Sequence, residues 1–194
     1  HCTEVQGGTE GTNFYQPARA KTPIVFIGQE FRDPTYTAGG ACPAGRICRY
    51  SDAALIDPPG NVTTASRVAT TTVVGTVGPG SRTISQKGVV AGEYGLPAVG
   101  LTVRKTGITT GTTEGTVNAT CVDVNSSVGG ITLLCQSRAG FVVGGGDSGS
   151  PVYVETNPGG TSAPRIVGVL WSSAGSFSVV SLIRQELGDF AVVF

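Results

Sequence analysis

The sequence predicts an all-β protein, either a sandwich or a barrel. Short apolar runs rich in Val, Ile and Thr recur along the 194 residues, and Gly, Pro, Asn and Ser separate them at close intervals. Only one segment has a helical pattern of apolar residues. Closely spaced short strands with so little helix are typical of sandwiches and barrels.

The expected strands occupy residues 23–27, 49–56, 72–77, 99–105, 115–124, 131–136, 151–155 and 165–172. Each run contains β-branched or aromatic residues, which fit a pleated, half-buried surface. Residues 84–98 are weakly patterned, and we expect them to join two halves of the chain. A short C-terminal helix is expected where Val180, Ile183 and Leu187 share one helical face before Gly188 ends it.

Charge is sparse and balanced, which excludes two classes of partner. Charged residues make up 13% of the chain, with 13 basic and 13 acidic side chains scattered in ones and twos. Because no Lys or Arg cluster is present, we expect no nucleic-acid partner. No run of eighteen apolar residues occurs, so we expect no membrane span. The length suffices for one large domain or two small barrels.

The five cysteines indicate disulfides rather than a metal site. No CxxC pair occurs and the single His lies far from any cluster, so we expect no metal. Cys42 and Cys48 flank a Pro-Gly turn, while Cys121 and Cys135 flank two strand-like runs joined by a polar turn. Two hairpin disulfides at these positions favour an oxidising compartment and hence a secreted protein. Buried free thiols are the alternative, and Cys2 is left over.

One glycine-rich stretch, GGGDSGSPV at residues 144–152, lies between two apolar segments. A serine hydroxyl becomes a nucleophile only beside a base and beside donors for an oxyanion, and glycines let successive N–H groups converge. We expect Gly146 and Ser148 to supply those N–H groups, with Asp147 folded beneath. Taken alone, the stretch also fits a plain turn. It does not fit the GxSxG elbow of α/β-hydrolases, because Ser150 replaces the last glycine and a strand pattern follows.

The segment GDSGSPV resembles the nucleophile segment of the chymotrypsin-like serine peptidases, particularly their secreted microbial members. HCT at the start resembles the His-Cys pair of that family, SDAALI resembles its aspartate strand, and residues 103–117 resemble the opening of its second barrel. The resemblance implies a catalytic triad of His1, Asp52 and Ser148, in the family's chain order. It also implies two six-stranded antiparallel Greek-key barrels packed together, over residues 1–90 and 91–194.

Several of these residues have other interpretations. His1 by itself fits a frayed end and Asp52 a solvated acid at a strand end, but the complete set favours catalysis. In the family, the acid before the nucleophile takes a buried cation as its partner. Lys105 is the candidate for that cation, and a solvated strand end is an equally good interpretation of it. Trp171 stands where relatives often place a serine bonded to the triad Asp, and ordinary core is its alternative.

The resemblance also locates the substrate pocket. Phe141, Val142 and Val143 precede the nucleophile and form one wall, while Ser172 and Ser173 lie on the facing strand. No acidic residue stands where a basic side chain would need one. We therefore expect substrates with small or apolar side chains before the scissile bond, rather than Arg or Lys.

The sequence thus predicts a secreted serine endopeptidase that acts on proteins or peptides without a metal or organic cofactor. A catalytically silent binding or structural module on the same fold is the alternative. In relatives, several strands precede the His-Cys pair and its cysteine pairs upstream. We therefore expect the first barrel to lack its N-terminal strands here. Either a separate or cleaved segment pairs with Cys2, or the chain alone is nearly inactive.

Overall fold

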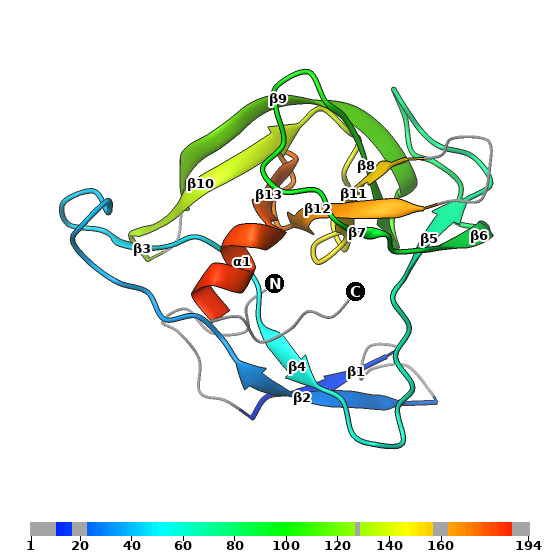
Figure 1. Cartoon of the computed structure of the whole chain (residues 1–194), viewed down its shortest axis with the longest axis horizontal. Helices are drawn as coiled ribbons and strands as arrows, with labels where there is room; N and C mark the ends of the chain where they lie inside the picture. Colours follow the sequence, from blue (N-terminus) through cyan, green and yellow to red (C-terminus); the bar gives the residue numbers. More distant parts are fainter. Residues whose placement is uncertain (1–10, 17–22, 127–128, 157–162, 188–194) are drawn as a thin grey trace.

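The computed structural model describes residues 11–16, 23–126, 129–156 and 163–187 (Figure 1). The regular secondary structure of this part of the chain is thirteen strands and one short helix, which confirms the all-β prediction. The strands are β1 (Asn13–Tyr15), β2 (Phe26–Arg32), β3 (Ile47–Arg49), β4 (Leu55–Asp57), β5 (Arg67–Thr71), β6 (Ile84–Val89), β7 (Gly92–Glu93), β8 (Thr102–Gly107), β9 (Gly111–Asn125), β10 (Ile131–Ala139), β11 (Pro151–Glu155), β12 (Pro164–Leu170) and β13 (Ser176–Val179), and the helix is α1 (Val180–Leu187).

Six strands of the C-terminal half pair in a ring, in the order β8, β9, β10, β13, β12 and β11, with β11 pairing back to β8. Every pairing in the ring is antiparallel. All six strands contribute to one apolar core, whose buried members include Val103, Val117, Ala139, Val152, Val167, Leu170, Phe177 and Val179. Burial of each large apolar side chain contributes about 1.5–3 kcal/mol. The ring therefore forms the rigid frame on which the candidate site is built.

The described N-terminal half is divided between two small sheets. β1, β2 and β4 form a three-stranded sheet, and β5 pairs with β6. In Figure 1 the three-stranded sheet lies below the ring, with α1 between them in this view. β3 pairs in parallel with β10 of the ring, and β7 pairs in parallel with β12. A closed six-stranded first barrel, and a domain boundary near residue 90, stay predictions.

The prediction of a strand at residues 72–77 is wrong. β5 ends at Thr71, and Val77 is 98% exposed. The chain instead turns tightly against β9, where the Gly75 N–H donates to Thr112 O at 3.0 Å. A Cβ atom on Gly75 would lie 2.0 Å from Gly78 O. This glycine is required because the chain folds back closely on residues 78–80, a turn that local apolar patterning does not reveal.

The strand expected at residues 49–56 is two strands, because the chain changes sheets within it. β3 pairs with β10, whereas β4 pairs with β2. Residues 50–54 make the crossing, and Ser51 and Ala53 are buried there. The sequence pattern also misses β1, β5, β6, β7 and β13. In β13, Ser176 and Ser178 interrupt the apolar pattern, yet all four residues of the strand are buried.

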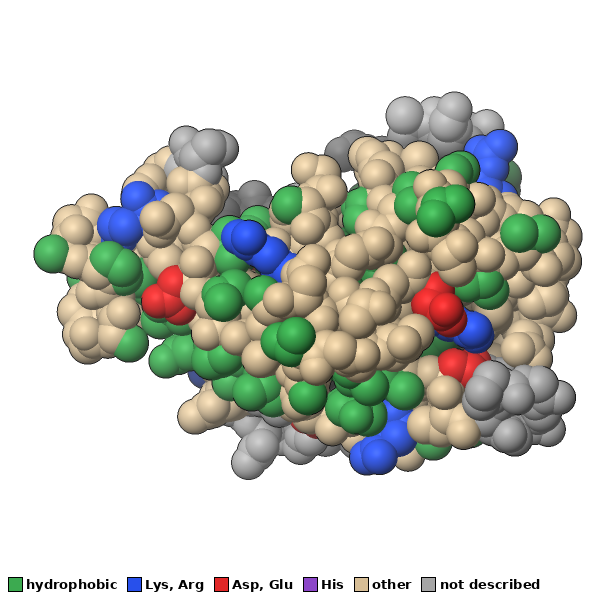
Figure 2. All heavy atoms as spheres, turned by 90° about the horizontal axis from the view of Figure 1, so that it is seen from above, with side chains coloured by type: hydrophobic (Ala, Val, Ile, Leu, Met, Phe, Trp, Pro, Cys, Tyr) green, Lys and Arg blue, Asp and Glu red, His purple; other side chains and the backbone are tan. Residues whose placement is uncertain are grey.

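Both expected disulfides, Cys42–Cys48 and Cys121–Cys135, are confirmed. His1 and Cys2 lie outside the described residues, so the partner expected for Cys2 stays a prediction. Within the described ranges, no helix is long and apolar enough to cross a membrane, and no group of side chains is arranged to hold a metal ion. On the face shown in Figure 2, uncharged side chains and backbone cover most of the surface and basic side chains are scattered.

Candidate active site

The glycine-rich stretch forms a compact loop between β10 and β11. The Asp147 N–H donates to Gly144 O and the Ser150 N–H donates to Asp147 O, both at 3.0 Å. The loop is also fastened to the end of β12, where the Gly149 N–H donates to Leu170 O at 2.7 Å and the Leu170 N–H donates to Ser150 O at 3.0 Å. These bonds fix the backbone on both sides of Ser148, so the loop is not a flexible linker.

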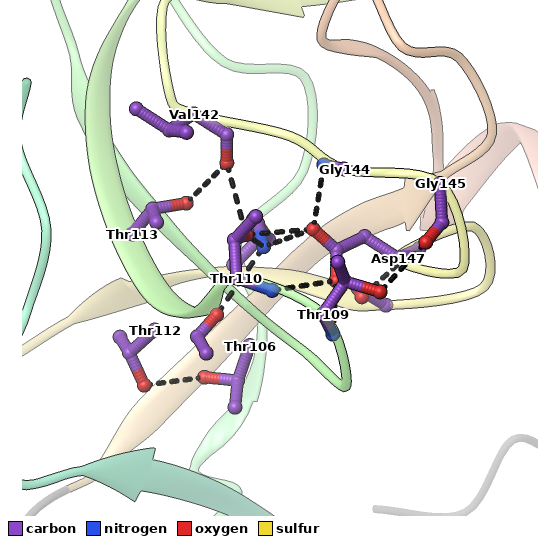
Figure 3. Close-up of polar contacts among 12 residues, drawn as sticks. Thr106, Thr109, Thr110, Thr112, Thr113, Val142, Gly144, Gly145 and Asp147 are labelled. Carbon is purple, nitrogen blue, oxygen red and sulfur yellow. Dashed lines mark hydrogen bonds and ion pairs between the residues drawn. The ribbon is translucent and has the colours of Figure 1, made fainter. Parts of the chain in front are cut away.

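Asp147 is the buried anchor of this loop (Figure 3). Its Oδ2 lies 2.7 Å from Lys105 Nζ and accepts hydrogen bonds from Thr110 Oγ1 at 2.6 Å and from the Gly144 N–H at 2.9 Å. Its Oδ1 accepts from the N–H groups of Thr109 at 2.9 Å and Thr110 at 3.2 Å. A carboxylate with this many donors is held in one orientation. The interpretation of Lys105 as the cationic partner is confirmed, and its side chain is fully buried.

The ionisation of Asp147 follows from these contacts. Burial by itself raises the pKa of a carboxyl. Here the hydrogen bonds from Lys105, Thr110 and the backbone of Gly144 and Thr109 outweigh burial and hold the pKa of Asp147 well below its ordinary value. Asp147 is therefore charged at neutral pH, and its charge is matched by the buried ammonium group of Lys105 at 2.7 Å.

Ser148 is exposed next to this buried anchor. Gly146 has a φ of +100°, a conformation that L side chains rarely adopt. Among the described residues, no acceptor takes a hydrogen bond from the N–H of Gly146 or from the N–H of Ser148. Two unengaged N–H groups on a fixed loop beside an exposed hydroxyl have the chemistry that an oxyanion requires.

The segment that supports the loop comes from the turn between β8 and β9, and sequence reasoning missed most of it. A Cβ atom on Gly107 would lie 2.3 Å from Asp147 Oδ1, so the glycine permits the close approach. Thr109 Oγ1 donates to Gly145 O at 2.7 Å, and Thr113 Oγ1 donates to Val142 O at 2.8 Å. The run of threonines in GITTGTTEG was the available signal, because threonine hydroxyls can satisfy nearby carbonyl groups.

Asp52 lies between β3 and β4 and is not a solvated acid, because its side chain is 14% exposed. Its N–H donates to Ser178 Oγ on β13 at 3.0 Å, and its Oδ1 lies 3.6 Å from Arg49 Nη2. Burial raises the pKa of Asp52, and the Arg49 guanidinium opposes that rise. β13 pairs with β12, whose last residue Leu170 is hydrogen-bonded to the Ser148 loop. Asp52 and Ser148 are thus both attached to the β12–β13 pair.

Trp171 is half-buried, and its indole N–H donates to Gln136 Oε1 at 2.9 Å. The Ser178 hydroxyl donates to the same oxygen at 2.9 Å, and Gln136 Nε2 donates to Tyr50 O at 2.8 Å. Gln136 is fully buried and was missed by sequence reasoning. A polar residue that follows the apolar run ITLL in an expected strand was the available signal. Gln136 joins Trp171, which directly follows β12, to the segment that carries Asp52.

The predicted pocket residues lie on the two sides of the nucleophile loop. Val142 and Val143 are half-buried just before it, while Ser172 is half-buried and Ser173 exposed just after β12. Ser172 Oγ accepts a hydrogen bond from the Ala174 N–H at 3.1 Å, which fixes this turn. Their role in substrate binding stays a prediction, and the predicted base His1 lies outside the described residues.

Comparison with known proteins gives a fold but no close relative. No model of a protein family matches the chain, and no curated protein matches it. A glutamic acid specific serine protease of known structure is 19% identical, with a TM-score of 0.56 over 87% of this chain and 75% of that chain. Thermobifida fusca protease A is 21% identical, with a TM-score of 0.54 over 94% and 85% of the two chains. Cellulomonas bogoriensis chymotrypsin is 21% identical, with a TM-score of 0.52 over 94% and 87%. The chain has the fold of the chymotrypsin-like serine proteases of microbes.

Proposed function

We propose that this protein is a secreted serine endopeptidase. The observation that carries the proposal is the nucleophile loop: an exposed Ser148 follows a buried Asp147 that is paired with Lys105 at 2.7 Å, and the N–H groups of Gly146 and Ser148 have no acceptor among the described residues. Such an anchor buries two charges, and removing them from water costs free energy. A silent binding module has no need of a loop held in this way. The fold and the two disulfides support the same proposal.

The proposed reaction is acyl transfer to Ser148. His1 takes the proton from Ser148 Oγ as the oxygen attacks the peptide carbonyl, and the oxyanion that forms accepts hydrogen bonds from the N–H groups of Gly146 and Ser148. His1 then gives the proton to the leaving amine, and the acyl group remains on Ser148. Water attacks the ester while His1 takes one of its protons, and His1 gives that proton to Ser148 Oγ as the bond to the acyl carbon breaks and the acid leaves. Asp52 holds the imidazole and stabilises its charged form.

The proposed substrates are proteins or peptides with a small or apolar residue before the scissile bond. Val142 and Val143 are half-buried beside the loop, and Ser172 and Ser173 follow the facing strand. One structural neighbour is described as specific for glutamic acid through a histidine triad. This chain has a single His. We therefore do not extend that preference to it.

A fluorophosphonate probe separates an active peptidase from a silent module. We expect the wild-type protein to gain the mass of one probe, and Ser148→Ala to gain none while keeping its β-sheet circular dichroism spectrum. Ser85→Ala is the matched control, because Ser85 lies on β6 and bonds to Thr70 O at 2.9 Å. It should be labelled like wild type. A labelled Ser148→Ala contradicts the proposal, and so does a wild-type protein that stays unlabelled when it is produced together with any residues encoded before His1.

A further inference from the structure

Arg49 is a buried arginine at the end of β3, and only 2% of its surface is exposed. Its backbone is fixed on both sides. The Cys42–Cys48 disulfide ends at the preceding residue, and β3 pairs with β10 so that Arg49 lies opposite Leu133. A buried charge needs compensating partners, so its contacts indicate what it is for.

One side of the guanidinium is fully engaged. Nη1 donates to Asp33 Oδ1 at 2.7 Å and to Pro34 O at 2.6 Å. The ring of Tyr36 lies 4.3 Å from Cζ, within the range of a cation–π contact. Burial and nearby acidic groups raise the pKa of Tyr36 to about 12, so this ring is neutral. These contacts hold the guanidinium in a fixed place.

The other side of the guanidinium faces Asp52. Nη2 lies 3.6 Å from Asp52 Oδ1, and the Arg49 side chain is fully buried. Within the described residues, neither Nη2 nor Nε of Arg49 has a hydrogen-bond partner. The ion pair with Asp33 uses Nη1. The Nη2 side of the positively charged guanidinium therefore faces Asp52.

The chain between Arg49 and Asp52 is fastened at each residue. The Tyr50 N–H and the Ser51 hydroxyl both donate to the carboxylate of Glu186 on α1. The Asp52 N–H donates to Ser178 Oγ. Among the described residues, the charged groups that face Arg49 are Asp33, Asp52 and Glu186. Glu186 is occupied by the backbone and hydroxyl groups, whereas Asp52 Oδ1 faces Nη2.

We propose that Arg49 is a positioning residue for the proposed reaction, whose buried guanidinium orients the Asp52 carboxylate and keeps it ionised. This inference rests on the proposed function, because it gives Arg49 its role through Asp52. A positive charge at this distance opposes protonation of Asp52, and it also opposes protonation of an imidazole held by Asp52. Arg49 therefore extends the active range toward lower pH.

Removal of the Arg49 charge changes two pKa values in a definite direction. Without Arg49, the protonated forms of Asp52 and of the imidazole are no longer disfavoured, so both pKa values rise. The acid limb of the activity profile then moves to higher pH, because it reports the group that must be deprotonated in the free enzyme. An arginine that served stability alone would lower the amount of folded protein without moving this limb.

The test measures the rate of fluorophosphonate labelling at Ser148 against pH. In Arg49→Met we expect the acid-limb midpoint to rise by about 1 pH unit. In Arg49→Lys, which keeps the charge, it should stay close to wild type. Arg104→Met is the control, because it removes an arginine whose ion pair with Glu114, at 2.8 Å, involves neither Arg49 nor Asp52. A midpoint that is the same in Arg49→Met and wild type overturns the proposal.

A second readout does not depend on activity. The carboxyl carbon of Asp52, followed by 13C NMR, should titrate about 1 pH unit higher in Arg49→Met than in wild type. An unchanged Asp52 titration overturns the role of Arg49 even if Ser148 is labelled. A wild-type protein that is not labelled refutes the proposed function, and the Asp52 titration then still decides whether Arg49 holds the carboxylate. If Arg49→Met does not fold, Arg49→Gln carries the same expected shifts.

Discussion

Replacement of Lys105 by Met tests whether the buried ion pair holds the nucleophile loop. The change removes the ammonium group 2.7 Å from Asp147 Oδ2 and leaves the carboxylate fully buried. Breaking a buried pair by removing one partner destabilises a protein by about 3–5 kcal/mol. Asp147 keeps its hydrogen bonds from Thr109, Thr110 and Gly144. We therefore expect a loss at the lower end, about 3 kcal/mol.

The assay is urea unfolding at pH 7, together with the rate of fluorophosphonate labelling in the folded protein. Once the cation is gone, burial raises the pKa of Asp147 and the loop loses its fixed anchor, so labelling should slow by about two orders of magnitude, as for loss of an oxyanion donor. Arg104→Met is the control on the same strand, because its ion pair is partly exposed and should contribute less than about 1 kcal/mol. A Lys105→Met protein as stable and as reactive as Arg104→Met would show that the buried ion pair does not hold the loop.

Three further predictions concern the same loop. Contacts in the folded protein hold the pKa of Asp147 below its ordinary value of 3.8. The stability that ionised Asp147 contributes is therefore complete above that pH and is lost as the pH falls toward the folded-state pKa. Urea midpoints measured downward from about pH 5 should decline less in Asp147→Asn than in wild type. Gly107→Ala places a Cβ 2.3 Å from Asp147 Oδ1, so we expect a loss of about 1–3 kcal/mol and slower labelling, and normal values for both would contradict the packing. A peptide library should show cleavage after small or apolar residues, and cleavage chiefly after Arg or Lys would overturn the pocket assignment.

The fold was predictable where local pattern and tertiary environment agree. The run PVYVE is β11 at the predicted residues, because its apolar residues suffice to place it in the ring. Local apolar patterning gave a wrong or missing strand where a contact with a distant segment decides the conformation. Residues 72–77 are rich in valine, yet Gly75 turns against β9. β13 is half serine, yet Ser178 is buried because Gln136 accepts its hydrogen bond.

The residues of the candidate site were likewise predictable only where local sequence determines them. The nucleophile loop was predictable because its glycines, its acid and its serine are contiguous in the sequence, and the resemblance of residues 103–117 pointed to Lys105. The roles of Gln136 and Arg49 were not predictable. Gln136 joins Trp171 to Ser178, and Arg49 faces both Asp33 and Asp52. These contacts arise only when β3, β10 and β13 come together.

Trapping the acyl-enzyme tests the proposed reaction of Ser148 most directly. The protein is mixed with a p-nitrophenyl ester of a small apolar acylated amino acid, quenched in acid during turnover, digested and analysed by mass spectrometry. We expect the acyl mass to appear on the peptide that contains Ser148, with none in Ser148→Ala. Ester hydrolysis with the acyl group on another residue, or with no acylated residue at all, would contradict it.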